Sequence, residues 1–337
     1  MDEAEQSRPF HILALSGGGY RGLYTATVLR ALEQSLGQPL AKYFDLLCGT
    51  SAGGLLTMGL AAEIPAAELE AMFADEGRRI FGAQSAVRRV FGKWVVAKHS
   101  ADGLKSVLTE RLGTTTIGDL KHRVLVPAVN YTTGKGQFFK TPHMPAFEMD
   151  YRRTLVDVGL ATTAAPTYFP LHRIDGEGVF ADGGLIGNSP GFFGLHEATK
   201  VLCVGEQTPV RVLSVGTMTL GATLRGAAGL DRGIFRWGAK VFDLVISAQE
   251  SAVDSMLTHV LGDCYYRIDD LATPDQSRDI SSLDVVTAGA TNVLRDRGVQ
   301  AARRALGDAK FSVFKSHLAA APTFYHGPNK SKGVVPC

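Results

Sequence analysis

The sequence is poor in cysteine and has no long uncharged apolar run. The first absence argues against disulfide-rich and cysteine-ligated metal proteins, and the second argues against a membrane-spanning protein. Its four cysteines are widely scattered at Cys48, Cys203, Cys264 and Cys337. Three of them lie in apolar segments, as ordinary core residues do, so neither a disulfide framework nor a metal site is expected. The longest uncharged apolar stretch, about Leu46–Ala62, is too short for a transmembrane helix, which needs about 20 such residues.

The amino-terminal residues also lack the features of a secretion signal. Residues 1–9 carry Asp2, Glu3 and Glu5, and they have neither a basic start nor an apolar stretch. A cytoplasmic location is therefore expected. The formal net charge is only +2, so the overall electrostatics indicate neither nucleic acid nor a membrane surface as a partner.

No linker or low-complexity segment divides the chain, so we expect one domain over residues 8–326, with flexible tails at 1–7 and 327–337. Strand-like apolar runs occur at Phe10–Leu15, Tyr43–Cys48, Val124–Val129, Val201–Val204 and Val210–Val215. Helical patterns separate most of them, which predicts an α/β fold with a mostly parallel central sheet covered by helices. A hairpin is predicted around Thr132–Gly136.

A G-x-S-x-G pentapeptide, Gly49–Gly53, lies between the apolar run Tyr43–Cys48 and the helix-like Gly54–Leu60. This context predicts a strand, a sharp turn and a helix. Flanking glycines let the strand and the helix approach closely, which exposes the serine hydroxyl at the positive end of the helix. Ser51 is therefore the candidate nucleophile, although such a short motif also occurs by coincidence in chains rich in Gly and Ser.

Three successive glycines, Gly17, Gly18 and Gly19, follow the first strand-like run and precede a helical pattern. Bare N–H groups at a helix start can hold an anion. A nucleotide-binding loop is one interpretation, because the run fits G-x-G-x-x-G and Glu33 lies in range, but a P-loop ending is absent. An oxyanion hole is the other, with amides directed at the oxygen that becomes negative during ester attack. We favour the second, since the first leaves Ser51 unexplained.

A third motif, Asp182-Gly183-Gly184, ends the short strand-like segment that begins at Gly178. An aspartate in this position is usually a turn former. Combined with an exposed serine and a glycine loop, it becomes a candidate general base. A free aspartate is a poor base at neutral pH, so the site must be partly desolvated, and the apolar neighbours Phe180 and Leu185 are compatible with that.

The three motifs resemble those of the patatin-like phospholipases, which use a serine–aspartate dyad. The resemblance rests on G-G-G-x-R-G at Gly17–Gly22, G-T-S-A-G at Gly49–Gly53, D-G-G at Asp182–Gly184, and the segment Ala161–Pro170. It covers roughly residues 10–217 and implies a three-layer fold that hydrolyses the acyl esters of membrane phospholipids without a cofactor.

The resemblance also implies a role for each residue of the motifs. Ser51 would be the nucleophile, and Asp182 would accept its proton during acylation and later activate a water. The backbone of Gly17, Gly18 and Gly19 would donate to the oxyanion. Arg21 would either bind a substrate phosphate or fix the glycine loop through a carboxylate, and the sequence does not choose.

Two rival functions use the same residues. An ordinary α/β-hydrolase triad requires a histidine after the aspartate, and His196, His259 and His317 satisfy that order. None of them lies in a glycine-rich loop at a strand end, and His196 and His259 fall in helical patterns, so we prefer the dyad. The second rival is a nucleotide-binding regulatory protein whose glycine loop grips phosphate without hydrolysis.

Two basic segments suggest further contacts. Residues 78–99 contain six basic and no acidic residues, and Val87, Phe91 and Trp94 share one apolar helical face. This helix either packs on the core or meets an anionic membrane, and a lid would combine both roles. In the second segment, Arg225, Arg232, Arg236 and Lys240 surround Trp237. They could hold a phosphate-bearing nucleotide and stack its base, or form a solvated helix entry.

The opening S-G-G-G-Y-R-G-L at Ser16–Leu23 is similar to that of the phospholipase effectors of bacterial antiphage systems. This resemblance implies activation by a cyclic dinucleotide, with Arg232, Arg236 and Trp237 as candidate activator contacts. It also implies that the active protein lies at the inner face of the membrane. No nucleic acid partner is expected, and a homo-oligomer is left open.

Overall fold

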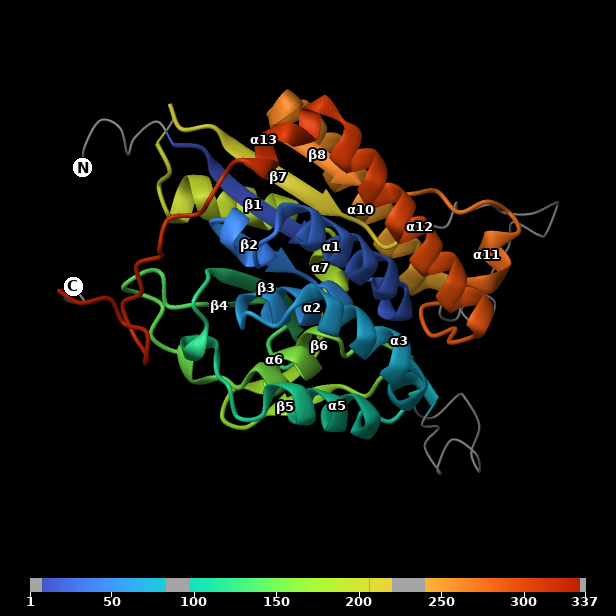
Figure 1. Ribbon diagram of the computed structural model, residues 1–337. Helices are drawn as coiled ribbons and strands as arrows, with labels where there is room; N and C mark the ends of the chain where they lie inside the picture. Colours follow the sequence, from blue (N-terminus) through green and yellow to red (C-terminus); the bar gives the residue numbers. More distant parts are fainter. Residues whose placement is uncertain (1–7, 83–96, 206, 220–239, 334–337) are drawn as a thin grey trace.

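One eight-stranded sheet forms the centre of the computed structural model, which describes residues 8–82, 97–205, 207–219 and 240–333 (Figure 1). The strand order is β5-β6-β3-β2-β1-β7-β8, and β4 pairs with β3. The strands are β1 (Phe10–Leu15), β2 (Leu46–Gly49), β3 (Val124–Asn130), β4 (Lys135–Lys140), β5 (His172–Ile174), β6 (Gly178–Asp182), β7 (Val210–Val215) and β8 (Tyr265–Ile268).

The five strands from β3 to β8 along this order are parallel to one another, whereas β4 and β6 run antiparallel to β3, and β5 antiparallel to β6. The predicted hairpin is the β3–β4 pair. Parallel strands carry helices on both faces, so their sequences read as continuous apolar runs. The predicted mostly parallel sheet is confirmed.

Helices cover both faces of the sheet. They are α1 (Gly22–Leu36), α2 (Ala52–Ala61), α3 (Ala66–Gly82), α5 (Asp102–Leu112), α6 (Leu155–Thr162), α7 (Gly184–Gly187), α8 (Gly191–His196), α10 (Lys240–Leu261), α11 (Gln276–Asp279), α12 (Ala288–Gly307) and α13 (Ser312–Lys315). Successive side chains of β1 enter two separate cores, because side chains alternate between the faces of a strand. Leu13 joins the larger core with α1, α2 and α3, and Ile12 joins the smaller one with α8 and α10 (Figure 1). The expected three-layer arrangement is therefore confirmed.

One predicted strand is wrong. Val201–Val204 is not a strand, because the chain continues from α8 into a π-helical turn over Glu197–Val201. Glu197 is buried in this turn, where its carboxylate contacts Lys140 at 2.6 Å and His143 at 3.0 Å. A short apolar run does not distinguish a strand from a buried helical turn. The strand beside β7 is instead β8, far later in the chain.

The segment expected to be a flexible tail, 327–337, is described as far as residue 333. The Asn329 side chain donates to the carbonyl oxygens of Leu120 at 3.1 Å and Gly118 at 3.4 Å. Residues 327–333 are therefore attached to the body of the domain. Within the described ranges, no helix has both the length and the apolar character needed to cross a bilayer.

Candidate active site

Ser51 lies on a tight turn between β2 and α2, as the pentapeptide predicts. Its backbone has φ +54° and ψ −125°, a combination that is costly for a residue with a side chain. A Cβ on Gly49 would collide with the Gly53 carbonyl, and one on Gly53 would collide with the Leu15 carbonyl. Both glycines are therefore required for the close approach of strand and helix that presents the serine hydroxyl.

The Ser51 hydroxyl donates to the Asp182 carboxylate, with 2.8 Å between Oγ and Oδ2. Sheet register brings these distant residues together. Cys48 pairs with Leu125 on β3, and Asp182 pairs with Ala128 further along the same strand. The second carboxylate oxygen of Asp182 accepts from the Gly184 N–H at 2.7 Å. The contact between positions 51 and 182 that the motifs predict is present.

The environment of Asp182 makes its carboxylate unusually basic. Its side chain is 1% exposed, and burial raises the pKa to about 7, although the hydrogen bonds from Gly184 and Ser51 oppose this rise. Burial disfavours the charged form of a carboxyl group because the protein interior solvates an ion poorly. A carboxylate that titrates near neutral pH is suited to accept a proton from a hydroxyl.

Ester hydrolysis is therefore expected to depend on pH with an ascending limb near pH 7. Only the ionised carboxylate can accept the Ser51 proton, so kcat/KM should fall about tenfold per pH unit below that midpoint. Initial rates on a soluble acyl ester between pH 5 and 9 measure this profile. A flat profile down to pH 5 would contradict the role of Asp182 as the base.

Gly18 and Gly19 border the space above Ser51, and their N–H groups donate to no acceptor within the described parts of the chain. Gly17 differs, because its N–H already donates to the Asn188 carbonyl at 3.1 Å. The expectation that Gly17 supplies an oxyanion donor is therefore corrected, and the free amides are those of Gly18 and Gly19. Gly19 has φ +56°, and a Cβ there would collide with the Leu283 carbonyl.

Arg21, expected either to bind a substrate phosphate or to fix the glycine loop, is almost fully buried. Its side chain is 9% exposed and is not among the described residues that line the cavity above Ser51. Its guanidinium donates to the Met218 carbonyl at 3.4 Å and forms no ion pair with any residue in the described ranges. Arg21 thus links the glycine loop to the segment after β7 through a carbonyl and not through a carboxylate.

A largely apolar cavity, partly open to solvent, lies above the Ser51 hydroxyl. Its apolar walls include Leu55, Met72, Phe73, Leu104, Phe169 and Ile246. These residues come from α2, α3, α5, α10 and the loop after α6. Among the described residues that line it, Asp182 alone carries a carboxylate. An apolar lining of this kind suits a hydrocarbon chain whose ester carbonyl reaches Ser51.

The three histidines of the rival triad do not reach Asp182. His317 is engaged by Asp45, with 2.7 Å between Nε2 and Oδ2, and His196 and His259 are exposed on helices. Where the structure describes the chain, no histidine borders the cavity. The geometry therefore offers a dyad and no triad.

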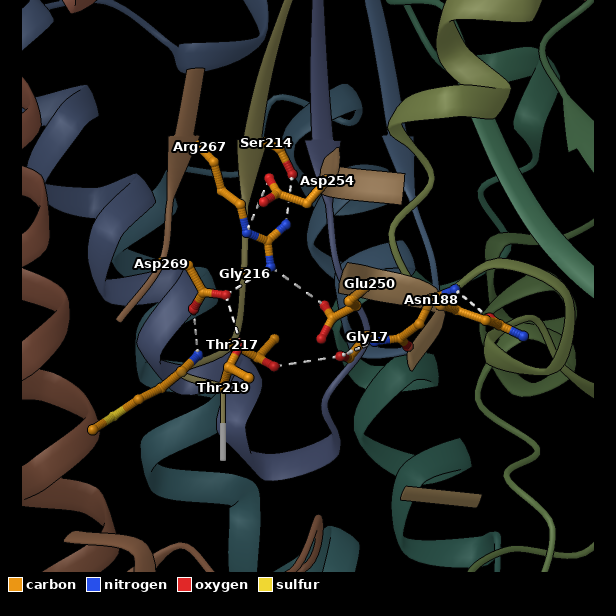
Figure 2. A network of polar contacts seen from close by, with 12 residues as sticks. Gly17, Asn188, Ser214, Gly216, Thr217, Thr219, Glu250, Asp254, Arg267 and Asp269 are labelled. Carbon is orange, nitrogen blue, oxygen red and sulfur yellow. Dashed lines mark hydrogen bonds and ion pairs between the residues drawn. The ribbon is translucent and has the colours of Figure 1, made fainter. Parts of the chain in front are cut away.

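A polar network behind the glycine loop was not anticipated from the sequence (Figure 2). The Gly17 carbonyl accepts from Asn188 Nδ2 at 2.9 Å and from Thr217 Oγ1 at 3.4 Å. The turn that carries Thr217 is held by Asp269, which accepts from the Met218 N–H at 3.0 Å. Asp269 is paired in turn with the buried Arg267 at 2.6 Å.

Sequence reasoning missed this network because its members are remote from the motifs along the chain. Only Asn188 carried a signal, since it lies within the same loop as the D-G-G motif. Arg267 also approaches the buried Glu250 of α10 at 3.8 Å, so the network joins β7, β8 and α10 behind the glycine loop.

Several sequence-based expectations fall outside the described residues. The candidate activator contacts are among them: Arg232, Arg236 and Trp237. Most of the basic segment 78–99 is also not described, although its first residues, 78–82, belong to α3. Cys48, Cys203 and Cys264 are free thiols. Among the residues that the structure describes, no group of three or more His, Cys, Asp or Glu side chains could hold a metal ion.

Comparisons with known proteins agree with the geometry. The model of the family described as patatin-like phospholipase matches residues 13–191. A cGAMP-activated phospholipase of Pseudomonas aeruginosa is 64% identical over 97% of this chain and 98% of its own length. A cGAMP-activated phospholipase of Vibrio cholerae is 36% identical over 86% of this chain and 90% of its own. Among solved structures, VipD from Legionella pneumophila aligns over 95% of this chain and 74% of its own, with 14% identity and a TM-score of 0.42. On the family match and the two sequence relatives, this chain belongs to the patatin-like phospholipase family of lipid acyl hydrolases.

Proposed function

We propose that this protein hydrolyses acyl esters of membrane phospholipids through a Ser51–Asp182 dyad, and that a cyclic dinucleotide activates it. The observation that carries the hydrolase is the 2.8 Å contact between the Ser51 hydroxyl and the buried Asp182 carboxylate at an apolar cavity. A serine hydroxyl is a weak nucleophile until a base takes its proton, and Asp182 is the base within reach.

Acylation begins when Ser51 Oγ attacks the ester carbonyl and its proton moves to Asp182 Oδ2. The amides of Gly18 and Gly19 donate to the oxyanion that forms. The tetrahedral intermediate then collapses, and the leaving alkoxide of the lysophospholipid takes the proton from Asp182. In deacylation, a water gives a proton to Asp182 and attacks the acyl carbonyl. Ser51 leaves with that proton, which releases a fatty acid.

The apolar cavity supports a lipid as the substrate, because a hydrocarbon chain gains free energy when it leaves water for such a surface. The phospholipid itself resides in a bilayer. We therefore propose that the active protein lies peripherally on the inner face of the membrane and draws one acyl chain into the cavity.

Activation by a cyclic dinucleotide is supported by the relatives named cGAMP-activated phospholipase, which match this chain along almost its whole length. Arg232, Arg236 and Trp237 stay the candidate contacts for the activator. Guanidinium groups pair with phosphates in a bidentate manner, and the indole ring can stack on a base.

Lipid mass spectrometry tests both halves of this proposal. Purified wild type and Ser51→Ala are mixed with phospholipid vesicles, each with cGAMP, cyclic di-GMP, cyclic di-AMP or a linear dinucleotide. We expect fatty acid and lysophospholipid release only from wild type with a cyclic dinucleotide. Equal release by wild type without any nucleotide would reject the activation, and release by Ser51→Ala would reject the dyad.

A further inference from the structure

The side-chain amide of Asn188 lies in the candidate active site, and only its nitrogen forms a hydrogen bond with a described residue. It is 1% exposed and borders the cavity above Ser51. Its Nδ2 donates to the Gly17 carbonyl at 2.9 Å. A carbonyl oxygen only accepts, so the nitrogen of the amide must face Gly17 and the oxygen Oδ1 must face away from that carbonyl.

Asn188 Oδ1 is buried and accepts no hydrogen bond from any residue in the described part of the chain. Leaving a buried acceptor unsatisfied costs about 1–3 kcal/mol, so most such atoms meet a partner in some state of the protein. An acyl ester has no N–H or O–H at its reacting group and cannot supply that partner. A water molecule carries two O–H donors and can.

Asn188 Oδ1 lies near the two side chains that act in the second half of the reaction. A Cβ built on Gly184 would be 3.2 Å from Asn188 Oδ1 and 3.0 Å from Asp182 Oδ1, so both oxygens lie close to Gly184. A Cβ built on Gly17 would collide with Asn188 Oδ1 and would be 2.9 Å from the Ser51 Cβ. Asn188 Oδ1 therefore lies close to both members of the dyad.

We propose that Asn188 holds the water that hydrolyses the acyl-enzyme, an inference that rests on the proposed dyad. One O–H of the water donates to Asn188 Oδ1, and the other transfers its proton to Asp182 as the water oxygen attacks the acyl carbonyl. The tetrahedral intermediate then expels Ser51 Oγ, which takes the proton back from Asp182. The products are the fatty acid and the free serine, so atoms and charges balance.

The hydrogen bonds that hold the glycine loop do not explain why Asn188 Oδ1 is buried without a partner among the described residues. The Gly17 N–H is bound by the main-chain carbonyl of Asn188 at 3.1 Å, and the Gly17 carbonyl has a second donor in Thr217 at 3.4 Å. Figure 2 shows Gly17 with Asn188 and Thr217 on opposite sides. The loop contacts use the Asn188 main chain and its Nδ2, and Oδ1 takes no part in them.

Burst kinetics on a p-nitrophenyl acyl ester separate the two half-reactions. In Asn188→Leu, which keeps the shape of the side chain, we expect a full burst of nitrophenol with a steady-state rate about 10²-fold lower. Intact-protein mass spectrometry should then find the acyl group retained on Ser51. Asn188→Ala, which leaves space for solvent, should give the same accumulation and serves as the second variant if the first does not fold.

Thr217→Val is the matched control, because it removes the other hydrogen bond to the Gly17 carbonyl and no acceptor from the cavity. We expect it to slow burst and steady state by the same factor, without acyl-enzyme accumulation. Equal loss of both phases in the Asn188 variants, or unchanged turnover, would overturn the proposal. Failure of the dyad itself would look different, because wild type would then form no acyl-Ser51 at all.

Discussion

Replacing Ser51 with alanine is expected to lower phospholipid hydrolysis by about 10⁶-fold. The substitution removes the atom that forms the covalent bond, and among the described residues no other hydroxyl forms a hydrogen bond with Asp182. Fatty acid release under activating conditions measures the loss. A fluorophosphonate probe should label wild type at Ser51 and should not label the variant.

The controls for this result are His196→Ala and His259→Ala. Both side chains are exposed and remote from the Asp182 contacts, so hydrolysis and probe labelling should match wild type. Loss of turnover in either variant would revive the histidine triad. Residual turnover by Ser51→Ala above about one thousandth of wild type would instead show that another nucleophile acts.

Replacing Asp182 with asparagine is expected to lower kcat by about 10³–10⁴-fold while the protein stays folded. The amide has nearly the same shape and can still accept from the Gly184 N–H, but it cannot take the Ser51 proton. Steady-state rates under activating conditions measure kcat. A loss below tenfold would mean that Asp182 is not the base.

The same variant should be more stable than wild type at alkaline pH. In wild type the folded carboxyl has a pKa of about 7 and the unfolded one about 3.8, so the folded state binds the proton more tightly. Stability contributed by this group is therefore present at low pH and is lost as pH rises from about 4 to 7. The shift corresponds to a penalty on the order of 4 kcal/mol for the buried ion.

Thermal unfolding at two pH values tests whether the asparagine variant is more stable than wild type at alkaline pH. At pH 8 the asparagine variant should have the higher Tm, because it carries no buried charge. At pH 5 the wild-type carboxyl is mostly protonated, and the difference should shrink markedly. A variant that is less stable than wild type at pH 8 would indicate that the carboxylate is well solvated or paired, and would contradict the basicity assigned to Asp182.

Much of the fold was predictable because its signals are local. β1 and β7 coincide with the predicted Phe10–Leu15 and Val210–Val215, since strands buried on both faces read as unbroken apolar runs. The run Val201–Val204 was misread, because a buried helical turn has the same local composition as a buried strand. β8 was missed, since Tyr265–Ile268 is half-buried at the sheet edge beside β7 and is short.

The positions of the nucleophile and its base were also readable from the sequence, for a backbone reason. Gly49 and Gly53 permit the close approach of strand and helix at the serine turn, and Gly183 permits the close approach of the next loop to Pro127 of β3. These requirements act over a few neighbouring residues, so they leave short motifs. The sequence alone thus determined which strand ends carry a serine and an aspartate.

The packing of distant segments decided which hydrogen-bonding groups at the site have a partner within the described parts of the protein and which do not. Asn188 takes the Gly17 amide and leaves those of Gly18 and Gly19 for an oxyanion, and Arg21 meets the Met218 carbonyl in place of a carboxylate. Burial by the surrounding elements sets the pKa of Asp182. Hydrogen-bond partners and desolvation arise from contacts between residues far apart along the chain, and a local pattern carries no information about them.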